Sequence, residues 1–541
     1  MNCLLKSGLW RNMKNEEMSS DRLSGLPEHL LLEILSRMPL KSAVGTSILS
    51  RRWRFLWTDL PDIHLCMDDD FGARKGTAEF FNLIRNNLLP KLNCPSIRKF
   101  TLDLGLFNDH IDKVRYQPGV INFNHLGEIN FNHLGKINFN YHGIDNDRER
   151  VSSHVLECFN RAASNNITTN TNTQLQEFSF NIDGEAHYYC DIFPDLPLSL
   201  FQIQSLVVLR LNPWLSVHQD DHHITNAVFN LPNLKILDVF FFSFHTTLLE
   251  KLVSSSPSLS HLSFTLRVPG VDTPILSPFT LNLSHPTLTR LDIRLSDAAH
   301  VTIDAPNLQQ LQVWVFGFNR EFLNRVSFLN SPTRLLACTI SVPYKPIDQL
   351  LLPSNLFSII STVKSLTLVE KKPCRLIAPI TFSRLTHLGL LLHRKLAGLP
   401  LLQKCPVLEV LTFDMTHSIS DMLSNRLWPL PDSPPQCLVY SVKRIEIFVP
   451  AFVDGVEIPL LDLLKCLLAT AKALELLKVT VTGPDLSKFQ DASFSESDFI
   501  KEVLDMPRSS ANCRFKFHGL QPTVLGDAIN SDSSMTSHLH H

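Results

Sequence analysis

The apolar positions of the sequence follow a phrase that returns along most of the chain. In its clearest form the phrase is Leu-x-x-Leu-x-Leu, as at Leu206, Leu209 and Leu211. Its last two apolar residues alternate with other residues, so they point to one side of a strand, and the first turns inward just before the strand begins. The phrase therefore predicts a short strand that is buried along one face.

Copies of this phrase recur at short intervals. They begin at Ile97, Leu175, Leu206, Leu234, Leu259, Leu288, Leu308, Leu335, Val363, Leu385 and Leu408. From Leu206 to Leu408 successive copies lie 20 to 29 residues apart, and in six copies a proline stands two residues before the first apolar position. Such a proline keeps the preceding segment from continuing into the strand. One unit cannot bury its own apolar edge, whereas stacked units cover one another, so we predict a leucine-rich-repeat solenoid of about eleven coils.

The repeat also departs from the standard leucine-rich pattern. The Asn or Cys that normally follows the strand is not consistently placed, so the pattern predicts neither the shape of a coil nor its curvature. At roughly 4.8 Å per strand, such a stack would form a parallel sheet about 50 Å long, large enough to bind a protein or a small molecule. A layered α/β domain is the alternative, and the irregular spacing with few helical segments argues against it.

The beginning of the chain has a helical pattern instead. Leu26, Leu30, Ile34 and Met38 recur every four residues, which predicts one apolar stripe on a helix. The proline that follows Leu26 fits a first helical turn, where its missing N–H costs nothing. The proline that follows Met38 ends the helix, because the residue before a proline is displaced from the α region.

Two further short helices are predicted after this stripe. The second covers Ser42–Leu49, and the third begins at Ser50 and carries Trp53, Leu56 and Trp57 on one side. Three helices in fewer than forty residues bury little surface by themselves, so something must cover the excess apolar face. The periodicity alone favours a helical cap that packs on the rest of its own chain.

The residues of this segment carry more information than their periodicity. The run DRLSGLPEHLLLEILSRMPLKSAVGTSILSRRWRFLW resembles the F-box of the plant F-box/leucine-rich-repeat proteins over Asp21–Leu60. The resemblance implies docking onto the Skp-type adaptor of an SCF (Skp–cullin–F-box) ubiquitin ligase, and Trp53 and Trp57 would hold the three helices together. The residues implied to face the adaptor are Leu26, Pro27, Leu30, Ile34, Leu35, Pro39 and Leu40.

The last hundred residues continue the strand phrase at wider spacing. Val442/Ile445/Ile447 and Leu474/Leu477/Val479 are two more copies, separated by an amphipathic helix at about Leu460–Lys472. The run PPQCL from Pro434, the run PRSS from Pro507 and the cysteine that follows resemble the plant FBD domain over Pro431–Phe517. Such a domain would provide the polar-faced end cap that a solenoid requires.

The expected fold is an α/β repeat: a three-helix F-box, an irregular leucine-rich-repeat solenoid and a C-terminal FBD α/β cap. The expected boundaries are a flexible extension at 1–20, the F-box at 21–60, the solenoid at 61–430 with a loop insertion at 105–172, the FBD domain at 431–518 and a disordered tail at 519–541.

Composition narrows the classes of partner. Among 541 residues the formal net charge is −2 and hydrophobic residues make up 44%, so bulk charge gives no reason to expect affinity for nucleic acid or a membrane. No stretch of about 18 uncharged apolar residues exists that could span a bilayer. The eleven cysteines include no C-x-x-C pair, and several, such as Cys338, Cys405 and Cys466, sit in apolar, strand-like runs. Reduced thiols in a cytoplasmic or nuclear protein are the simplest reading.

The sequence offers few candidates for chemistry. His218 and His222 with the acids Asp220 and Asp221 form the best metal candidate, but the same residues make an ordinary solvated loop, which we favour. The period-eight repeat at Ile121–Gly143 suggests a local duplication in a loop. The basic run Arg51, Arg52 and Arg54 belongs to the F-box phrase, which favours a rim of that domain over a nucleic-acid patch. We therefore predict no catalytic site, no metal and no cofactor.

These observations lead to a substrate-recognition subunit of an SCF-type ubiquitin ligase. The F-box would bind the adaptor, and thereby a cullin–RING ligase, while the repeats hold a protein target. One alternative is a leucine-rich-repeat scaffold that takes no part in ubiquitination. An unrecognised hydrolase or metal-dependent enzyme is the third.

Overall fold

The computed structural model describes most of the repeat phrases and the helical segment near the N-terminus. The described residues are 25–66, 97–104, 175–182, 198–215, 226–241, 246–266, 279–296, 299–316, 326–342, 350–351, 354–370, 376–377, 381–392, 399–415, 434–450, 457–482 and 496–518. The chain divides into two compact units, Met1–Thr289 and Arg290–His541, which are taken in turn.

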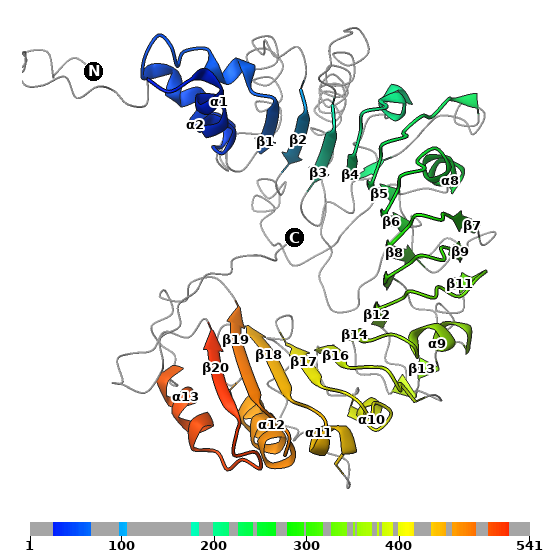
Figure 1. The fold of residues 1–541 in the computed structure, drawn as a ribbon, viewed down its shortest axis with the longest axis vertical. Helices are drawn as coiled ribbons and strands as arrows, with labels where there is room; N and C mark the ends of the chain where they lie inside the picture. Colours follow the sequence, from blue (N-terminus) through cyan, green and yellow to red (C-terminus); the bar gives the residue numbers. More distant parts are fainter. Residues whose placement is uncertain are drawn as a thin grey trace, which may run out of the picture. The chain divides into compact units, whose positions relative to one another are not determined.

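The first unit joins a helical segment to a parallel sheet (Figure 1). Its N-terminal helices are α1 (Glu28–Ser36), α2 (Leu40–Gly45) and the 3₁₀ turns η2 (Thr46–Ile48) and η3 (Leu56–Asp59). The strands that follow pair in chain order and are β1 (Asp62–Cys66), β2 (Lys99–Leu104), β3 (Glu177–Ile182), β4 (Val208–Leu215), β5 (Ile236–Phe241) and β6 (His261–Leu266). The 3₁₀ helix η8 (Leu198–Gln202), helix α8 (Thr246–Ser254) and strand β7 (Phe279–Ser284) lie in the connections.

The second unit consists of a longer stack of parallel strands. In spatial order they are β8 (Arg290–Ser296), β10 (Gln310–Phe316), β12 (Ala337–Val342), β14 (Ser365–Glu370), β16 (His387–Leu392), β17 (Val410–Asp414), β18 (Arg444–Pro450), β19 (Leu476–Thr482) and β20 (Arg514–His518). Two short parallel pairs accompany them: β9 (Ala299–Asp304) with β11 (Val326–Phe328), and β13 (Leu350–Leu351) with β15 (Leu376–Ile377). The helices are α9 (Ser354–Ile360), α10 (Leu399–Leu402), α11 (Gln436–Tyr440), α12 (Glu457–Thr470) and α13 (Glu496–Asp505).

The repeated phrase accounts for the core of both units. Every apolar position of the thirteen predicted phrases is at most 5% exposed. The register stacks equivalent positions, as where Leu209 pairs with Leu237 and Leu237 with Leu262. Parallel strands buried on one face by their neighbours are what the sequence predicts, so the repeat architecture is confirmed.

Hydrogen bonds in the turns link successive coils, although the chain lacks a consistent Asn after each strand. Short polar side chains just before one strand donate to carbonyl oxygens of the preceding coil. The pairs are Ser205 Oγ to Leu175 O at 2.8 Å, Asn233 Nδ2 to Gln204 O at 3.0 Å, Ser258 Oγ to Pro232 O at 2.7 Å, Ser441 Oγ to Pro406 O at 3.1 Å and Ser510 Oγ to Leu474 O at 2.6 Å. In these five turns, side chains just before a strand therefore provide hydrogen-bond donors to backbone carbonyls of the preceding coil.

Three structural details differ from the sequence predictions. The predicted third helix from Ser50 is a series of turns followed by η3, and the second helix is divided into α2 and η2. Cys466 lies in helix α12, which runs from Glu457 to Thr470 rather than Leu460 to Lys472. The region expected to cap the solenoid contains the two predicted strands, now β18 and β19, and a third strand that was not predicted, β20, which leaves the apolar core partly open.

Two further findings concern the described residues as a whole. No helix among them is long and apolar enough to cross a membrane. The cysteines among them are free thiols: Cys66, Cys338, Cys405, Cys437, Cys466 and Cys513. The period-eight repeat at Ile121–Gly143 lies outside the described residues.

Candidate functional site

Helix α1 presents apolar side chains on two faces. Leu31 and Leu35 are fully buried, whereas Leu30 and Ile34 are each 37% exposed and Met38 is 38% exposed. Residues four apart lie one above another on a helix, so Leu30 and Ile34 form an outer row beside the inner pair, and Met38 continues this row just beyond the last helical residue, Ser36. The doubled stripe of the sequence therefore divides into a face for the core and a face for solvent.

Prolines position both helices of this segment. The carbonyl oxygen of Pro27 accepts hydrogen bonds from the N–H groups of Leu30 at 3.0 Å and Leu31 at 3.3 Å, which begins helix α1. Glu28 occupies the first turn, where the helix dipole favours negative charge. Pro39 stands in the same position before α2, and its carbonyl oxygen accepts from the N–H of Ala43 at 3.0 Å.

A small core holds the segment together. Helices α1 and α2 and the 3₁₀ helix η3 are in mutual contact. The side chains buried between or beside them are Leu31, Leu35, Leu40, Ala43, Trp53, Leu56, Trp57 and Leu60. Arg52 Nη2 donates to the carbonyl oxygen of Leu26 at 2.6 Å, and this bond joins the two ends of the segment. Trp53 and Trp57 thus occupy the interior, where their large apolar area contributes most to packing.

The outside of the segment is unusually apolar. Ile48 is 89% exposed, and Leu49 and Phe55 are also mostly exposed. Together with the outer row of α1 they make six of the twelve large hydrophobic side chains that are exposed among the described residues, although the segment spans only residues 25–66. We call Leu30, Ile34, Met38, Ile48, Leu49 and Phe55 the outer apolar set. Exposed large hydrophobic side chains that gather in one short segment favour an interaction surface there.

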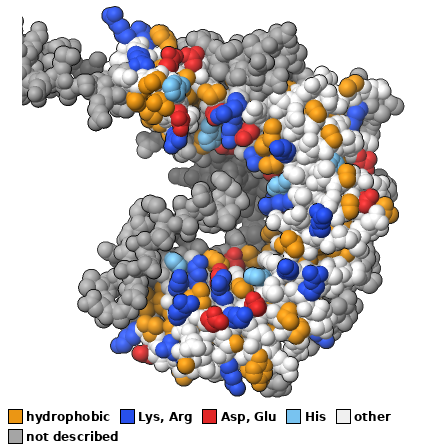
Figure 2. All heavy atoms as spheres, viewed as in Figure 1, with side chains coloured by type: hydrophobic (Ala, Val, Ile, Leu, Met, Phe, Trp, Pro, Cys, Tyr) orange, Lys and Arg blue, Asp and Glu red, His pale blue; other side chains and the backbone are white. Residues whose placement is uncertain are grey.

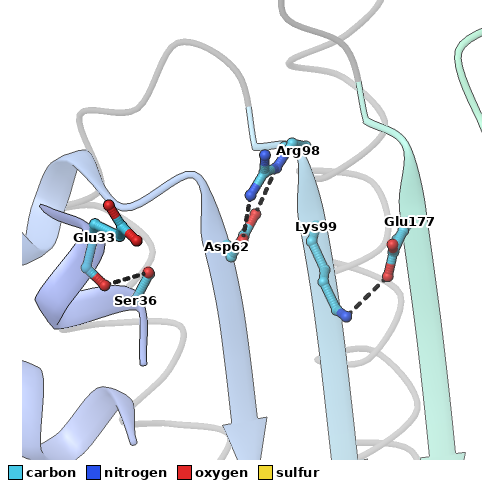
Figure 3. Close-up of polar contacts among 6 residues, drawn as sticks. All are labelled: Glu33, Ser36, Asp62, Arg98, Lys99 and Glu177. Atoms are coloured by element: carbon cyan, nitrogen blue, oxygen red, sulfur yellow. Dashed lines mark hydrogen bonds and ion pairs between the residues drawn. The ribbon is translucent and has the colours of Figure 1, made fainter. Parts of the chain in front are cut away.

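Basic side chains accompany the outer apolar set. Arg51, Arg52 and Arg54 are exposed, and the guanidinium of Arg54 lies 5.4 Å from the centre of the Phe55 ring. Glu33 is engaged locally, since its carboxylate pairs with Arg37 at 2.7 Å and its carbonyl oxygen accepts from Ser36 Oγ at 2.8 Å (Figure 3). The charge at this end of the segment therefore favours a partner with acidic groups around an apolar centre.

Polar pairs on β1, β2 and β3 connect the segment to the sheet behind it. Arg98 forms two hydrogen bonds with the carboxylate of Asp62, at 3.0 and 2.6 Å, and Lys99 Nζ lies 2.8 Å from a carboxylate oxygen of Glu177 (Figure 3). The bidentate geometry fixes the position of strand β1, which directly follows η3. The hydrogen bond to Asp62 raises the pKa of Arg98, and the negative charge of Asp62 adds to that effect.

A second polar group lies further along the same strands. His64 Nε2 is 2.5 Å from one carboxylate oxygen of Asp103, and Asn181 Nδ2 donates to the other at 2.6 Å. Burial raises the pKa of Asp103, but the hydrogen bonds from His64 and Asn181 and the charge of His64 outweigh it, so the pKa of Asp103 is lowered overall.

The seven residues predicted to face an adaptor differ in their exposure to solvent. Leu30, Ile34, Pro27 and Pro39 are exposed and Leu26 is half-buried, so these five are accessible at the surface. Leu35 and Leu40 are buried in the segment's own core, and contact of these two residues with an adaptor stays a prediction. The periodicity could not separate them, because adjacent residues on a helix lie only about 100° apart.

Sequence reasoning missed part of the exposed surface. Ile48, Leu49 and Phe55 were not proposed as contact residues, and Met38 was treated only as part of the stripe. Ile48 and Leu49 lie at the end of a predicted helix, where an apolar pair followed by Ser50 and two arginines is a usable signal. Phe55 lies between residues of the core, and only the turn observed at 51–55 directs it outward.

The remaining candidates for chemistry receive no support. The His218/His222 metal candidate lies outside the described residues, and the described residues contain no group of three or more His, Cys, Asp or Glu side chains that could hold a metal ion. Burial raises the pKa of Cys338 and of Cys405 to about 12 and that of Cys437 to about 11. Thiols that stay protonated near neutral pH are poor nucleophiles, so these cysteines are structural.

Comparison with known proteins also finds an F-box at the helical segment and leucine-rich repeats in the region of the strands. The F-box domain family matches residues 23–65, and the family described as "FBD-associated F-box protein At5g56370, LRR repeats" matches residues 166–335. The Arabidopsis thaliana F-box/FBD/LRR-repeat proteins At1g51370 and At5g22660 are 26% and 25% identical to this chain, and each alignment covers 91% of this chain and 95% of the relative.

A third relative is more similar to this chain, but over a short stretch only. The Arabidopsis thaliana F-box/FBD/LRR-repeat protein At2g04230 is 51% identical over 53 residues, which make up 10% of this chain and 12% of that protein. These alignments agree with the structure, in which a helical segment with the outer apolar set is followed by parallel repeat strands. Over most of its length the chain is therefore similar to the Arabidopsis thaliana F-box/FBD/LRR-repeat proteins, and its residues 23–65 match the F-box domain family.

Proposed function

We propose that this protein is the substrate-recognition subunit of an SCF-type ubiquitin ligase. The F-box binds the Skp-type adaptor through the outer apolar set, and the repeat strands bind a protein target. The single observation that supports this most directly is the concentration of exposed large hydrophobic side chains on the F-box. A folded segment that keeps Leu30 and Ile34 at its surface while burying Leu31 and Leu35 is built to pack on two sides.

Such a receptor performs no bond chemistry itself. By holding the target and the adaptor at once, it raises the concentration of the target beside the ubiquitin-carrying enzyme, and the linkage makes the second encounter effectively intramolecular. The hydrogen-bonded strands β1, β2 and β3 give the F-box a fixed attachment to the first repeats. The protein would act in the cytoplasm or nucleus, where free thiols such as Cys338 and Cys405 persist.

The test is binding of the purified full-length chain to a purified Skp-type adaptor, measured by isothermal titration calorimetry. Ile34→Asp places a charge at the centre of the outer apolar set, so we expect affinity to fall at least about tenfold. The control is Leu329→Asp, which alters a residue that is similarly apolar and more exposed, at 70%, in the second unit. We expect this control to bind like the unaltered protein.

The same measurement distinguishes the scaffold alternative. If the unaltered protein does not bind any Skp-type adaptor of its own species, the ligase assignment fails and a repeat scaffold remains. If Ile34→Asp and Leu329→Asp bind equally well, adaptor docking does not use this surface. Unfolding temperatures of both variants establish that a loss of binding is not a loss of fold.

A further inference from the structure

Strand β20, at the end of the parallel sheet of the second unit, is unusually exposed for a strand of this sheet. It pairs with β19 on one edge and is the last strand of that sheet in the described part of the chain. Its residues alternate between exposed and half-buried, whereas their partners Leu477 and Val479 on β19 are buried. The strand is therefore placed like an interior coil of the solenoid but lacks a neighbour on its outer side.

One face of β20 is strongly basic. Arg514, Lys516 and His518 occupy its three exposed positions, and Lys516 pairs in register with Lys478 of β19. Arg444 lies one strand further, in register with Leu476 and thus in the same row as Arg514. Like charges on directly opposite strand positions repel each other.

Few negative charges compensate for this arrangement. Among the positions of β18, β19 and β20 on this face, Glu446 is the only carboxylate. No ion pair joins Arg514 or Lys516 to a carboxylate of the described residues. Figure 2 shows several Lys and Arg side chains over these last strands, with fewer Asp and Glu side chains among them. The surface therefore presents a positive potential that an acidic ligand would neutralise.

The other face of β20 is apolar and only partly covered. Phe515 and Phe517 stack with ring centres 6.4 Å apart, and both remain half-exposed. The guanidinium of Arg508 lies 5.2 Å from the centre of the Phe515 ring, and Leu504 on α13 is exposed nearby in the sequence. An added strand would bury this aromatic pair as each preceding strand buries the one before it.

The backbone of β20 can also form hydrogen bonds with an added strand, along the edge that points away from β19. The N–H of Arg514 bonds to the carbonyl oxygen of Glu475 at 2.9 Å, so it faces β19. Backbone groups alternate along a strand, which directs the N–H and C=O groups of Phe515 and Phe517 away from β19. Strand β20 therefore combines a basic face, an aromatic face and a backbone edge that no described strand occupies.

We propose that β20 binds an extended acidic segment of a partner protein, which adds to the sheet as a further strand. The segment would alternate acidic and apolar residues, with acids opposite Arg514, Lys516 and His518 and apolar residues against Phe515 and Phe517. A second copy of this chain is a poor occupant, because pairing β20 with itself would oppose Arg and Lys with Arg and Lys. This inference deepens the proposed target binding by naming the chemistry of the bound segment, and it does not depend on adaptor docking.

The experiment uses the purified full-length chain without any adaptor. The probe is a fluorescent nine-residue peptide, blocked at both ends, in which Asp or Glu alternates with Val, and binding is followed by anisotropy. Two control peptides separate the contributions: one gathers the same acids at one end, and one is N-methylated at the residues whose N–H groups would face β20. We expect both controls to bind at least roughly tenfold more weakly, because one loses the alternation and the other the backbone bonds.

Variants of the protein test the location of the site. Arg514→Glu/Lys516→Glu should weaken binding of the acidic peptide at least roughly tenfold and should bind a peptide that alternates Lys and Val. The matched control, Lys465→Glu/Lys501→Glu, changes the net charge equally on exposed positions of α12 and α13 and should bind like the unaltered protein. The gain of binding to the cationic peptide shows that the first variant still folds.

Several results would overturn the proposal. Equal binding of all three acidic peptides would reduce it to general attraction of negative charge. Equal loss in both double variants would place the site elsewhere. A concentration-dependent dimer in light scattering that Arg514→Glu/Lys516→Glu alters would assign the edge to self-association. Failure of peptide binding with intact adaptor binding rejects this inference alone, and the converse rejects only the adaptor proposal.

Discussion

His285 Nε2 lies 2.9 Å from the carbonyl oxygen of Ser256, a residue of the preceding coil, and both residues are buried. The imidazole is held from its other side as well, since Nδ1 is 3.2 Å from the hydroxyl of Thr287. Nε2–H donates to the carbonyl oxygen of Ser256, whereas the single hydroxyl hydrogen of Thr287 is donated to the carbonyl oxygen of Leu259 at 2.7 Å. Burial lowers the pKa of His285, and the backbone hydrogen bond to Ser256 offsets only part of that effect.

This arrangement predicts a loss of stability in mild acid. The folded protein binds a proton at His285 less readily than the unfolded chain, whose histidine pKa is about 6.5. The stabilisation is therefore complete above that pH and decreases as the pH falls below it. Urea unfolding at pH 7.5 and 5.5 should show a pH-dependent difference that is smaller in His285→Gln. An identical difference in both proteins would contradict the assignment.

The His64–Asp103 contact predicts a second, more acidic dependence. Because the pKa of Asp103 is lowered in the fold, its contribution is present above the unfolded value of about 3.9 and is lost as the pH falls through the folded value. Asp103→Asn should lower the free energy of unfolding by about 1 kcal/mol at pH 7 and by less at pH 3, because only the ionised carboxylate is the favoured partner of His64. Thermal unfolding against pH measures this, with Asp59→Asn, an exposed carboxylate on η3, as control.

Two adjacent residues of helix α1, Ile34 and Leu35, allow effects on adaptor binding and on stability to be measured separately. Leu35→Ala opens the core beneath the helix and should lower the free energy of unfolding by about 2–5 kcal/mol. Ile34→Ala removes a partly exposed side chain, so its effect on stability should be below about 1 kcal/mol while adaptor affinity falls. Chemical denaturation and calorimetry on both variants check this, and a larger stability loss in Ile34→Ala would reverse our assignment of the two faces.

The repeats could be predicted because their signal is repeated many times. Each of the phrases such as Leu411/Phe413 carries the same three apolar positions, and burial requires all of them. The strands β1 and β20 were missed because Ile63/Leu65 has no preceding proline and β20 alternates its two phenylalanines with charged residues. End strands have one neighbour each, so selection for the phrase is weaker there.

The F-box surface was only partly predictable. The sequence shows that α1 has more apolar residues than one face needs, but a four-residue periodicity assigns neither Leu30 nor Leu31 to the core. That choice depends on where α2 and η3 approach the helix, which is a tertiary property. The turn at 51–55 similarly directs Trp53 inward and Phe55 outward without a local sequence signal.

The sheet of the second unit contains one crowded position that a double-mutant cycle can test. A Cβ added to Gly389 on β16 would lie 3.0 Å from Oγ1 and 3.3 Å from Cγ2 of Thr367, its register partner on β14. Gly389→Ala should therefore be more favourable in a Thr367→Ala background than in the unaltered protein, with a coupling of about 0.5 kcal/mol or more. Additive effects on the free energy of unfolding would show that Thr367 moves aside at no cost.

Buried thiols provide a last test, of the repeat core itself. Because burial raises the pKa of Cys338 and Cys405 to about 12, almost none of either thiol is ionised at pH 7.4. N-ethylmaleimide should leave both unmodified in the native protein over a time that labels both fully in urea, while the half-buried Cys66 reacts at an intermediate rate. Peptide mapping by mass spectrometry reads each site separately. Native labelling of Cys338 as fast as Cys66 would mean that the coil around β12 opens readily, and the closed core described for the second unit would then be incorrect at that strand.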